Sequence, residues 1–282
     1  MILVFGRSGQ VARELARLAP QAHYMTRDQA DLSDPETCAV AIRSYAPRAV
    51  INAAAYTIVD RAEEEEALAT RINGTAPAAM AEACAALGVP LVQISTDYVF
   101  DGRGNAPFLP EHSTAPLGAY GRSKLKGEEG VRAAGGCHAI LRTSWVFSAH
   151  GKNFVKTMLQ LGAERDTLHV VADQIGGPTP ARAIAEACLS IALQLQDDPA
   201  KTGTYHFSGT PATSWARFAH TIMFKAGLRC QIREISSKEY PAPAPRPLNS
   251  RLDCTSLNVF GLTQPDWQTE LDNTILELKG MS

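Results

Sequence analysis

The sequence lacks the features that mark metal-stapled, secreted or membrane-spanning chains. Its six cysteines include no C-x-x-C pair, so the zinc and disulfide-framework spacings are absent. The apolar start, "MILVF", meets a glycine at once and has neither the basic flank nor the length of a signal peptide. No later apolar run is long enough to cross a bilayer. We therefore expect a cytoplasmic protein with reduced cysteines and no membrane partner.

The sequence also lacks an excess of charge of either sign. The formal net charge is −2, so no general attraction to nucleic acid or to an anionic membrane is expected. The densest charge run is "DRAEEEE", at residues 60–66. We expect it to form the acidic, solvated first turn of a helix, where carboxylates complement the positive end of the helix dipole.

What is present is a regular alternation of short apolar runs and amphipathic helical patterns. Strands then helices in turn imply right-handed crossovers, so we expect an α/β fold with a Rossmann-like, doubly wound parallel sheet. The predicted strands are "ILVF" (2–5), "AHYMT" (22–26), "AVINAAA" (49–55), "PLVQIST" (90–96) and "CHAILRTSWVF" (137–147). The predicted helices cover 10–18, roughly 60–87, and a segment that contains Tyr120.

The second half of the chain is less regular. Helical patterns occur at 153–161, 179–195 and 214–226, and "LHVVAD" and "TYHFSG" read as short strands. The proline-rich stretch at 239–253 cannot be helical. We expect residues 1–147 to form the nucleotide-binding domain with the catalytic residues. Residues 148–282 are expected to form mainly a smaller C-terminal α/β substrate lobe, with some segments returning to the first domain.

A glycine-rich turn follows the first strand. "VFGRSGQVA" places Gly6, Gly9 and Ala12 in G-x-x-G-x-x-A spacing. The first glycine permits a tight turn, and the second lets the backbone approach a pyrophosphate at the helix N-terminus. Ala12 in the third place still permits close packing of helix on strand. Because the turn closes the first strand and opens the first helix, it predicts a dinucleotide site.

The charges near this turn bear on which dinucleotide binds. NAD sites usually place an acidic residue at the end of the second strand, whereas Arg27 stands there and Arg7 lies inside the turn. Two guanidinium groups would favour the 2′-phosphate of NADPH. Asp28 is adjacent to Arg27, so NADH is kept as the alternative.

Tyr120 and Lys124 lie four residues apart on a predicted helix and therefore share one face. An ammonium group near a phenol lowers its pKa from about 10, which would make Tyr120 a proton donor to a carbonyl oxygen. Thr96, at the end of a strand, could add a hydrogen bond to the developing oxyanion. Tyr-x-x-x-Lys also arises by chance in exposed helices, and the order of the other motifs is what favours the chemical interpretation.

The chain resembles the dTDP-4-dehydrorhamnose reductase family of extended short-chain dehydrogenases/reductases. The resemblance rests on "FGRSGQVA", "VINAAAYTIVDRAE", "STDYVFDG", "YGRSKLKGE", "LRTSWVF", "VVADQIGGPT" and "RPLNSRLD", which together run from residue 4 to residue 253. It implies NAD(P)H-dependent reduction of the 4-keto group of dTDP-6-deoxy-L-lyxo-4-hexulose to dTDP-L-rhamnose.

The resemblance also implies a set of site residues. Thr96, Tyr120 and Lys124 match the catalytic trio, and Asp97, Tyr98 and Trp145, with Thr96, are expected to meet the substrate. Residues expected to contact the cofactor are Gly6, Arg7, Ser8, Gly9, Gln10, Val11, Arg27, Asp31, Leu32, Ala53, Ala54, Ala55, Tyr56 and Thr57, with Tyr120 and Lys124.

Some members of the family hold magnesium at a homodimer interface through glutamates, for which Glu14 and Glu186 are candidates; surface glutamate is the competing interpretation. Arg246 or Arg251 could meet the substrate diphosphate, and a structural salt bridge would explain either equally well.

Two rival functions stay open. One is a nucleotide-sugar epimerase or 4,6-dehydratase of the same superfamily. Dehydration is disfavoured because Asp97 is followed by Tyr98 where related dehydratases have a glutamate. The other is a non-catalytic cofactor-binding subunit that resembles the regulatory beta subunit of methionine adenosyltransferase, since a fold can retain a site without using it.

Overall fold

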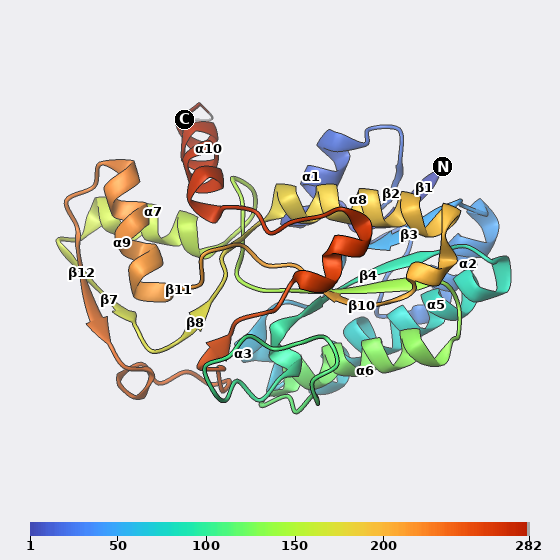
Figure 1. Cartoon of the computed structure of the whole chain (residues 1–282), viewed down its shortest axis with the longest axis horizontal. Coiled ribbons are helices and arrows are strands. Elements are labelled where there is room, and N and C mark those ends of the chain that lie inside the picture. The colour runs from blue at the N-terminus through green and yellow to red at the C-terminus, as the bar shows by residue number, and fades with distance from the viewer. Residues whose placement is uncertain (281–282) are drawn as a thin grey trace.

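A six-stranded parallel sheet forms the centre of the computed structural model, which describes residues 1–280 (Figure 1). Its strands lie in the order β10-β5-β4-β3-β1-β2, and every neighbouring pair is parallel. The chain runs from β1 to β2 in one direction and from β3 onward in the other. The order of strands therefore reverses between β1 and β3, which is where open α/β sheets bind ligands. The strands are β1 (Ile2–Phe5), β2 (His23–Met25), β3 (Ala49–Asn52), β4 (Leu91–Thr96), β5 (His138–Thr143) and β10 (Gly203–His206).

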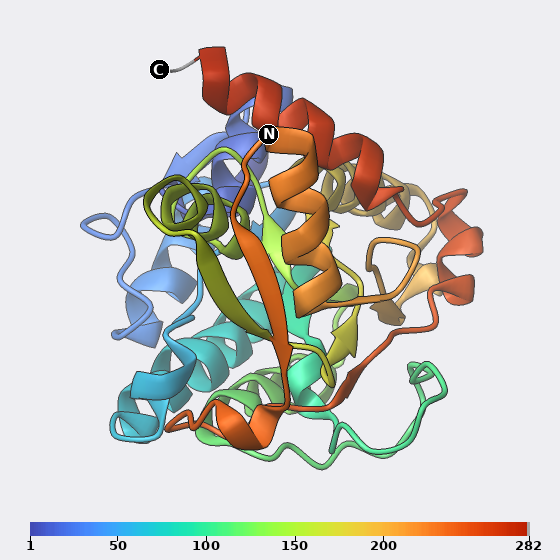
Figure 2. The ribbon, with the colours of Figure 1, turned by 90° about the vertical axis from the view of Figure 1, so that its left-hand side faces the viewer.

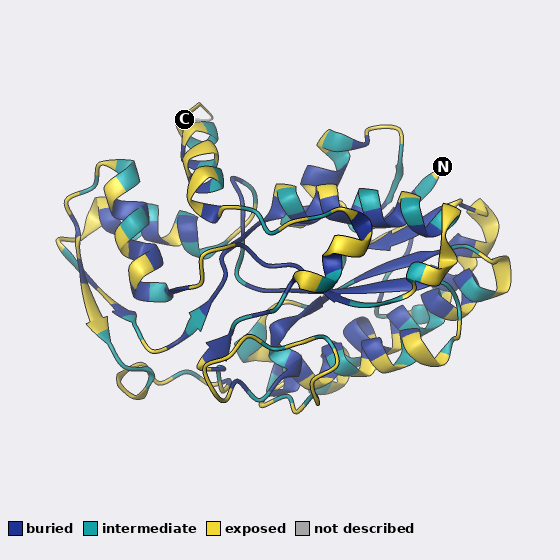
Figure 3. Cartoon of the chain, viewed as in Figure 1, coloured by how far each residue is buried: buried dark blue, intermediate teal, exposed yellow. Residues whose placement is uncertain are grey.

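Helices cover both faces of this sheet. In Figure 1, α1 (Gln10–Leu18) and α8 (Ala181–Asp197) lie above the sheet, and α2 (Pro35–Tyr45), α5 (Ala76–Leu87) and α6 (Ala119–Ala133) lie below it. Every residue of β3 and β5 is buried, as the dark sheet in Figure 3 shows. Burial on both faces explains why the centres of these strands, residues 50–51 and 139–141, are continuous apolar runs rather than alternating ones. The predicted doubly wound fold is confirmed.

A smaller lobe sits beside the carboxyl ends of the large sheet, at the left of Figure 1 and facing the viewer in Figure 2. It contains α7 (Phe154–Glu164), β7 (Thr167–Val171), α9 (Trp215–Ala226), β12 (Gln231–Ile235) and α10 (Trp267–Gly280). Buried side chains such as Phe147, Phe218 and Trp267 form its own core. Short pairings link the lobe to the rest of the chain through β6 (Val146–Phe147), β8 (Ile175–Gly176), β9 (Thr179–Pro180), β11 (Thr213–Ser214) and β13 (Asn249–Ser250).

The helix predicted over 60–87 is not continuous. The structure has α3 (Val59–Ala62), α4 (Glu66–Thr70), a π-helical turn at Arg71–Thr75 and then α5. Within that turn, Asn73 accepts a hydrogen bond from Tyr56 N at 2.8 Å and donates to Tyr56 O at 2.9 Å. A π turn often marks a functional site. Here it aims one amide at the loop after β3, and a helical period alone does not reveal this.

The acidic run at 60–66 is only in part the solvated first turn that we predicted: Asp60 and Glu66 do lie in the first turns of α3 and α4, but several of the carboxylates have partners. Glu63 accepts a hydrogen bond from Ala119 N at 2.8 Å, and Glu65 accepts one from the Tyr56 hydroxyl at 2.7 Å. Glu66 forms a bidentate ion pair with Arg122. The carboxylates therefore fasten the loop after β3 to the start of α6: Glu63 and Glu66 meet donors on α6, 56 residues away, and Glu65 meets Tyr56 in the loop itself.

The structure also bears on the cysteines and on membrane-spanning helices. All six cysteines are free, and five of them are buried. Between residues 1 and 280 no helix is both long enough and apolar enough to span a bilayer.

Candidate active site

A cavity of about 1430 Å³ lies at the carboxyl ends of β1, β3 and β4. It is larger than the roughly 300–1,000 Å³ typical of a site for one small ligand, so it has room for a dinucleotide and a second molecule. It brings together every residue that the sequence assigned to the cofactor, the catalytic trio or the sugar. Those lining residues are Gly6, Arg7, Ser8, Gly9, Gln10, Val11, Arg27, Asp31, Leu32, Ala53, Ala54, Ala55, Tyr56, Thr57, Thr96, Asp97, Tyr98, Tyr120, Lys124 and Trp145.

The glycine turn has the geometry that a pyrophosphate needs. Gly6 has φ +105°, and a Cβ there would lie 3.3 Å from the Ala53 carbonyl carbon, so no other residue fits without strain. Gly9 is the N-cap of α1 and has no side chain to bond the free N–H groups, and the first turn of α1 carries no acidic residue. The unsatisfied N–H groups and the positive end of the helix dipole therefore face the cavity.

Two arginines border the adenosine side of the cavity. Arg27 Nε lies 3.2 Å from Asp31 Oδ2, and its side chain is 73% exposed. A hydrogen bond from Ser33 N, together with Arg27, holds the pKa of Asp31 below its usual range. An exposed pair of this kind contributes only about 0–1 kcal/mol, so Arg27 can turn to a phosphate at little cost. Arg7 has no ion pair within residues 1–280, and Asp28 does not line the cavity.

The end of β4 carries a buried carboxyl group. The Thr96 hydroxyl donates to Asp97 Oδ1 at 3.1 Å and accepts from Tyr98 N at 3.2 Å. Burial raises the pKa of Asp97 to about 6, against the hydrogen bonds from Ser250 and Thr96. Asp97 Oδ2 has no hydrogen-bond partner in the part of the chain that is described. This oxygen is therefore ready to accept a hydroxyl of a ligand.

Tyr120 and Lys124 share a face of α6, but the lysine does not tune the phenol as we predicted. Burial first, and the Asp97 charge second, raise the pKa of Tyr120, while a hydrogen bond with Thr96 opposes them. Lys124 Nζ donates instead to Ile94 O at 2.7 Å, and burial lowers its pKa to about 8. The prediction of a lowered phenol pKa is wrong for this arrangement, because desolvation of the phenolate outweighs a cation that bonds elsewhere.

An ion pair that the sequence did not reveal lies below these groups. Glu128, on α6, accepts hydrogen bonds from Arg142 at 2.9 and 2.7 Å and from Ser95 Oγ at 2.6 Å. Both charged side chains are almost completely buried. Burial alone would raise the pKa of Glu128, but the Arg142 bonds more than offset it and the pKa is lowered. The pair locks α6 against β4 and β5, and so fixes where Tyr120 and Lys124 point.

The opposite wall of the cavity is formed by Trp145. This residue has φ +49°, which interrupts the strand predicted over 137–147 and separates β5 from β6. Its ring stacks on Trp215 of α9 at 3.7 Å between centroids, and it packs on Gly176 so closely that a Cβ there would lie 2.7 Å from the indole. The sequence identified Trp145 but not its stacking partner Trp215, which supports the indole from behind and does not itself line the cavity.

The two arginines proposed for a diphosphate do not line the cavity. Arg246 Nη2 lies 2.9 Å from Asp60 Oδ2, so this residue forms the structural salt bridge that was the competing interpretation. Arg251 Nη1 donates to Asn249 Oδ1 at 3.0 Å.

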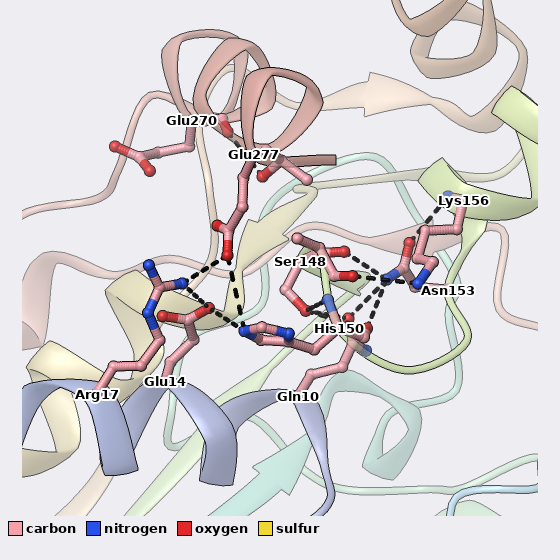
Figure 4. Close-up of polar contacts among 11 residues, drawn as sticks. Gln10, Glu14, Arg17, Ser148, His150, Asn153, Lys156, Glu270 and Glu277 are labelled. Carbon is pink, nitrogen blue, oxygen red and sulfur yellow. Dashed lines mark hydrogen bonds and ion pairs between the residues drawn. The ribbon is translucent and has the colours of Figure 1, made fainter. Parts of the chain in front are cut away.

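The two candidate magnesium ligands do not form a site in this chain. Glu14 is buried, with Oε1 lying 3.3 Å from His150 Nε2 and 3.5 Å from Arg17 Nη1 (Figure 4). Glu186 is exposed and pairs with Arg182 at 3.1 Å. No group of three metal-binding side chains occurs among the described residues. A carboxylate enclosed by a guanidinium and an imidazole does not fit a cation.

The fold and this site define an extended short-chain dehydrogenase/reductase: a glycine turn at the switch point, with threonine, tyrosine and lysine facing one cavity. Residues 1–279 match the family model described as the RmlD substrate binding domain.

The chain is 44% identical to dTDP-4-dehydrorhamnose reductase of Sinorhizobium fredii over 95% of this chain and 94% of that protein. It is 40% identical to the Escherichia coli K12 enzyme of the same name, over 98% and 97%. The crystal structure of dTDP-4-dehydrorhamnose reductase from Bacillus anthracis in complex with NADP superposes with a TM-score of 0.91 at 34% identity, over 98% of each chain. The chain belongs to the dTDP-4-dehydrorhamnose reductase family.

Proposed function

We propose that this protein reduces the 4-keto group of dTDP-6-deoxy-L-lyxo-4-hexulose to give dTDP-L-rhamnose, with NADPH as the preferred reductant and NADH as the alternative. The observation that carries the proposal is the single cavity, in which a pyrophosphate turn and a Thr-Tyr-Lys set face one another. Two relatives that cover nearly the whole chain carry the name of this reductase, and one related structure contains NADP.

The dinucleotide fits the residues that are present. Free N–H groups at the start of α1 bind the pyrophosphate, and Arg7 and Arg27 bind the 2′-phosphate. When bound, NADPH supplies the hydride. Lys124, already fixed to Ile94 O, offers its two remaining protons to the ribose hydroxyls.

Tyr120 donates the proton to the ketone oxygen. Its raised pKa keeps the phenol protonated at neutral pH, so the proton is available when negative charge develops on that oxygen. The Thr96 hydroxyl, which donates its one proton to Asp97 when no substrate is present, turns that proton to the ketone oxygen and stabilises the oxyanion. The unpartnered Oδ2 of Asp97 accepts a sugar hydroxyl, and the face of Trp145 covers the apolar side of the sugar ring.

We also propose a division of labour along the chain. Residues 1–147 hold the dinucleotide and the reacting groups, and residues 148–282 mainly form the sugar-nucleotide lobe. The parallel strand β10 and helix α8 support the view that some segments of the second half return to the first domain. A homodimer and a cytoplasmic location stay predictions.

The test is loss of NADPH absorbance with enzymatically generated dTDP-6-deoxy-L-lyxo-4-hexulose, for the wild type and Tyr120→Phe. We expect the variant to lose a factor of about 10²–10⁴ in kcat, as for removal of a general acid, while it still binds NADPH. Tyr205→Phe serves as a control, because that hydroxyl bonds Lys201 O far from the cavity.

A wild-type protein that binds NADPH but never oxidises it with this ketone would contradict the proposal and favour the cofactor-binding regulatory role. Turnover of another nucleotide sugar would favour the epimerase or reductase alternatives.

A further inference from the structure

We propose that Lys152 binds the pyrophosphate of the dinucleotide from the side opposite the glycine turn. This inference rests on the proposed function and adds a cofactor-binding residue from the second half of the chain. Lys152 and Gly151 line the cavity, yet they lie in a loop at residues 148–153 that no nucleotide-binding motif includes. The loop is held over the glycine turn by side chains on both of its sides (Figure 4).

The inner side of the loop is fixed by Gln10, the first residue of α1. Gln10 Oε1 accepts hydrogen bonds from Ser148 Oγ at 2.9 Å and from Asn153 Nδ2 at 2.8 Å. Gly151 has φ +64°, and a Cβ on it would lie 3.5 Å from Gln10 Cγ. Residues 151–152 are therefore positioned directly against the turn whose N–H groups face the cavity.

The outer side of the loop packs against side chains of α1, α7 and α10. His150 Nε2 lies 3.3 Å from Glu14 Oε1, one helical turn beyond Gln10, and 4.0 Å from Glu277 Oε1 of α10. Lys156 Nζ donates to Ala149 O at 3.1 Å. With contacts on both flanks, the backbone that carries Lys152 stays beside the start of α1, within the cavity wall.

The charges that line the cavity indicate which part of the dinucleotide Lys152 binds. Six cationic side chains line the cavity: Arg7, Arg13, Arg27, Arg61, Lys124 and Lys152. Three of them have partners, since Arg27 pairs with Asp31, Arg61 with Glu65, and Lys124 with Ile94 O. Within residues 1–280, Lys152 forms no ion pair or side-chain hydrogen bond. A free ammonium beside a helix N-terminus without acidic residues suits a doubly charged pyrophosphate.

The test is the equilibrium binding of NADPH and of NADH, each measured by isothermal titration calorimetry in the absence of any sugar nucleotide. For Lys152→Met we expect the Kd of both dinucleotides to rise by the same factor, about tenfold, because both carry the same pyrophosphate. Lys152→Arg should restore most of the affinity. Lys126→Met is the matched control, since that side chain is 66% exposed on α6 and lies outside the cavity.

Two comparisons make the proposal falsifiable. Arg27→Gln should weaken NADPH and leave NADH unchanged, so a Lys152→Met effect confined to NADPH would assign Lys152 to the 2′-phosphate and overturn the proposal. Unchanged Kd values for both dinucleotides would also overturn it, including the case in which only the KM of the sugar nucleotide rises. The titration needs no sugar, so an error in the assigned sugar leaves its result intact. A wild type that binds neither dinucleotide would refute the proposed function itself.

Discussion

The two walls of the cavity are held in place by different means. The wall formed by Thr96, Tyr120 and Lys124 stands on β4 and α6, where backbone hydrogen bonds and the buried Glu128–Arg142 pair fix each position. The facing wall, formed by Trp145 and the 148–153 loop, stands on side chains: a stacked tryptophan and the amide of Gln10. The first wall belongs to the scaffold of the sheet, and the second to the contact between the lobes.

This difference fits the division of roles that we propose. A proton donor must be held within a fraction of an ångström of its productive geometry, and a rigid sheet edge achieves that. A wall that selects a ligand by contact can be built from side chains, which adapt to the ligand more readily. The difference predicts that substitutions on the first wall cost folding stability or rate, whereas substitutions on the second cost affinity.

The largest stability effect is expected for Glu128→Gln. The change leaves Arg142 buried without its counter-charge, which costs about 3–5 kcal/mol in the free energy of unfolding. Urea denaturation gives the value. Glu129→Gln, next on the same helix and 52% exposed, should change it by less than about 0.5 kcal/mol. If both substitutions changed the free energy of unfolding equally, the buried Glu128–Arg142 pair would not be what holds the first wall in place.

Asp97→Asn is expected to increase the free energy of unfolding, by less than Glu128→Gln decreases it. Burial raises the pKa of Asp97 from 3.8 to about 6, so the folded state holds this proton more tightly than the unfolded state. Wild-type stability is therefore reduced as the pH rises from about 4 to 6, and the loss persists above 6. Asparagine removes that cost, which for a shift of about two pKa units amounts to about 1–3 kcal/mol. Urea denaturation at pH 7.5 should show the gain, and the same measurement near pH 4 should show little.

If the difference in free energy of unfolding between Asp97→Asn and the wild type did not depend on pH, the carboxylate charge would not be the cause of the lower wild-type stability. The variant should also have a higher KM for the sugar nucleotide, because an amide accepts the sugar hydroxyl less strongly than a carboxylate does.

The smallest effect is expected for Trp215→Leu, on the second wall. Without the Trp215 ring, Trp145 loses its stacking partner. We expect this to weaken sugar-nucleotide binding by about 0.5–1.5 kcal/mol, which corresponds to a KM about two- to tenfold higher. The Kd of NADPH should stay the same. Phe224→Leu is the control, because this aromatic residue on the same helix is 86% exposed. A fall in kcat with an unchanged KM would contradict the division between the walls.

Much of the glycine turn and of the first wall could be predicted from the sequence because their signals are local. The strand at 2–5 and the helix at 10–18 lie where the pattern placed them, since apolar periodicity and a glycine turn are properties of neighbouring residues. The trio of Thr96, Tyr120 and Lys124 follows from the end of a strand and an i,i+4 spacing. The pKa of Tyr120 could not be predicted, because it depends on burial and on Asp97 rather than on the lysine one turn away.

The errors share one cause. The acidic run at 60–66 reads as a solvated helix face, yet its carboxylates meet donors on α6 and on the loop before β13. The helix over 60–87 reads as continuous, yet Asn73 bends it toward the loop after β3. In each case the deciding partner lies 17 or more residues away in the chain, beyond the reach of a local pattern.

The order of motifs was enough to specify a doubly wound sheet, a dinucleotide turn and a reductase family, because each depends on residues a few positions apart. The tertiary structure was needed to bring Trp215 behind Trp145, to pair Glu128 with Arg142, and to lay the 148–153 loop over Gly9 and Gln10. Those contacts join residues from 14 to 143 positions apart. Their energies come from burial and from hydrogen-bond geometry, which exist only once the chain has folded.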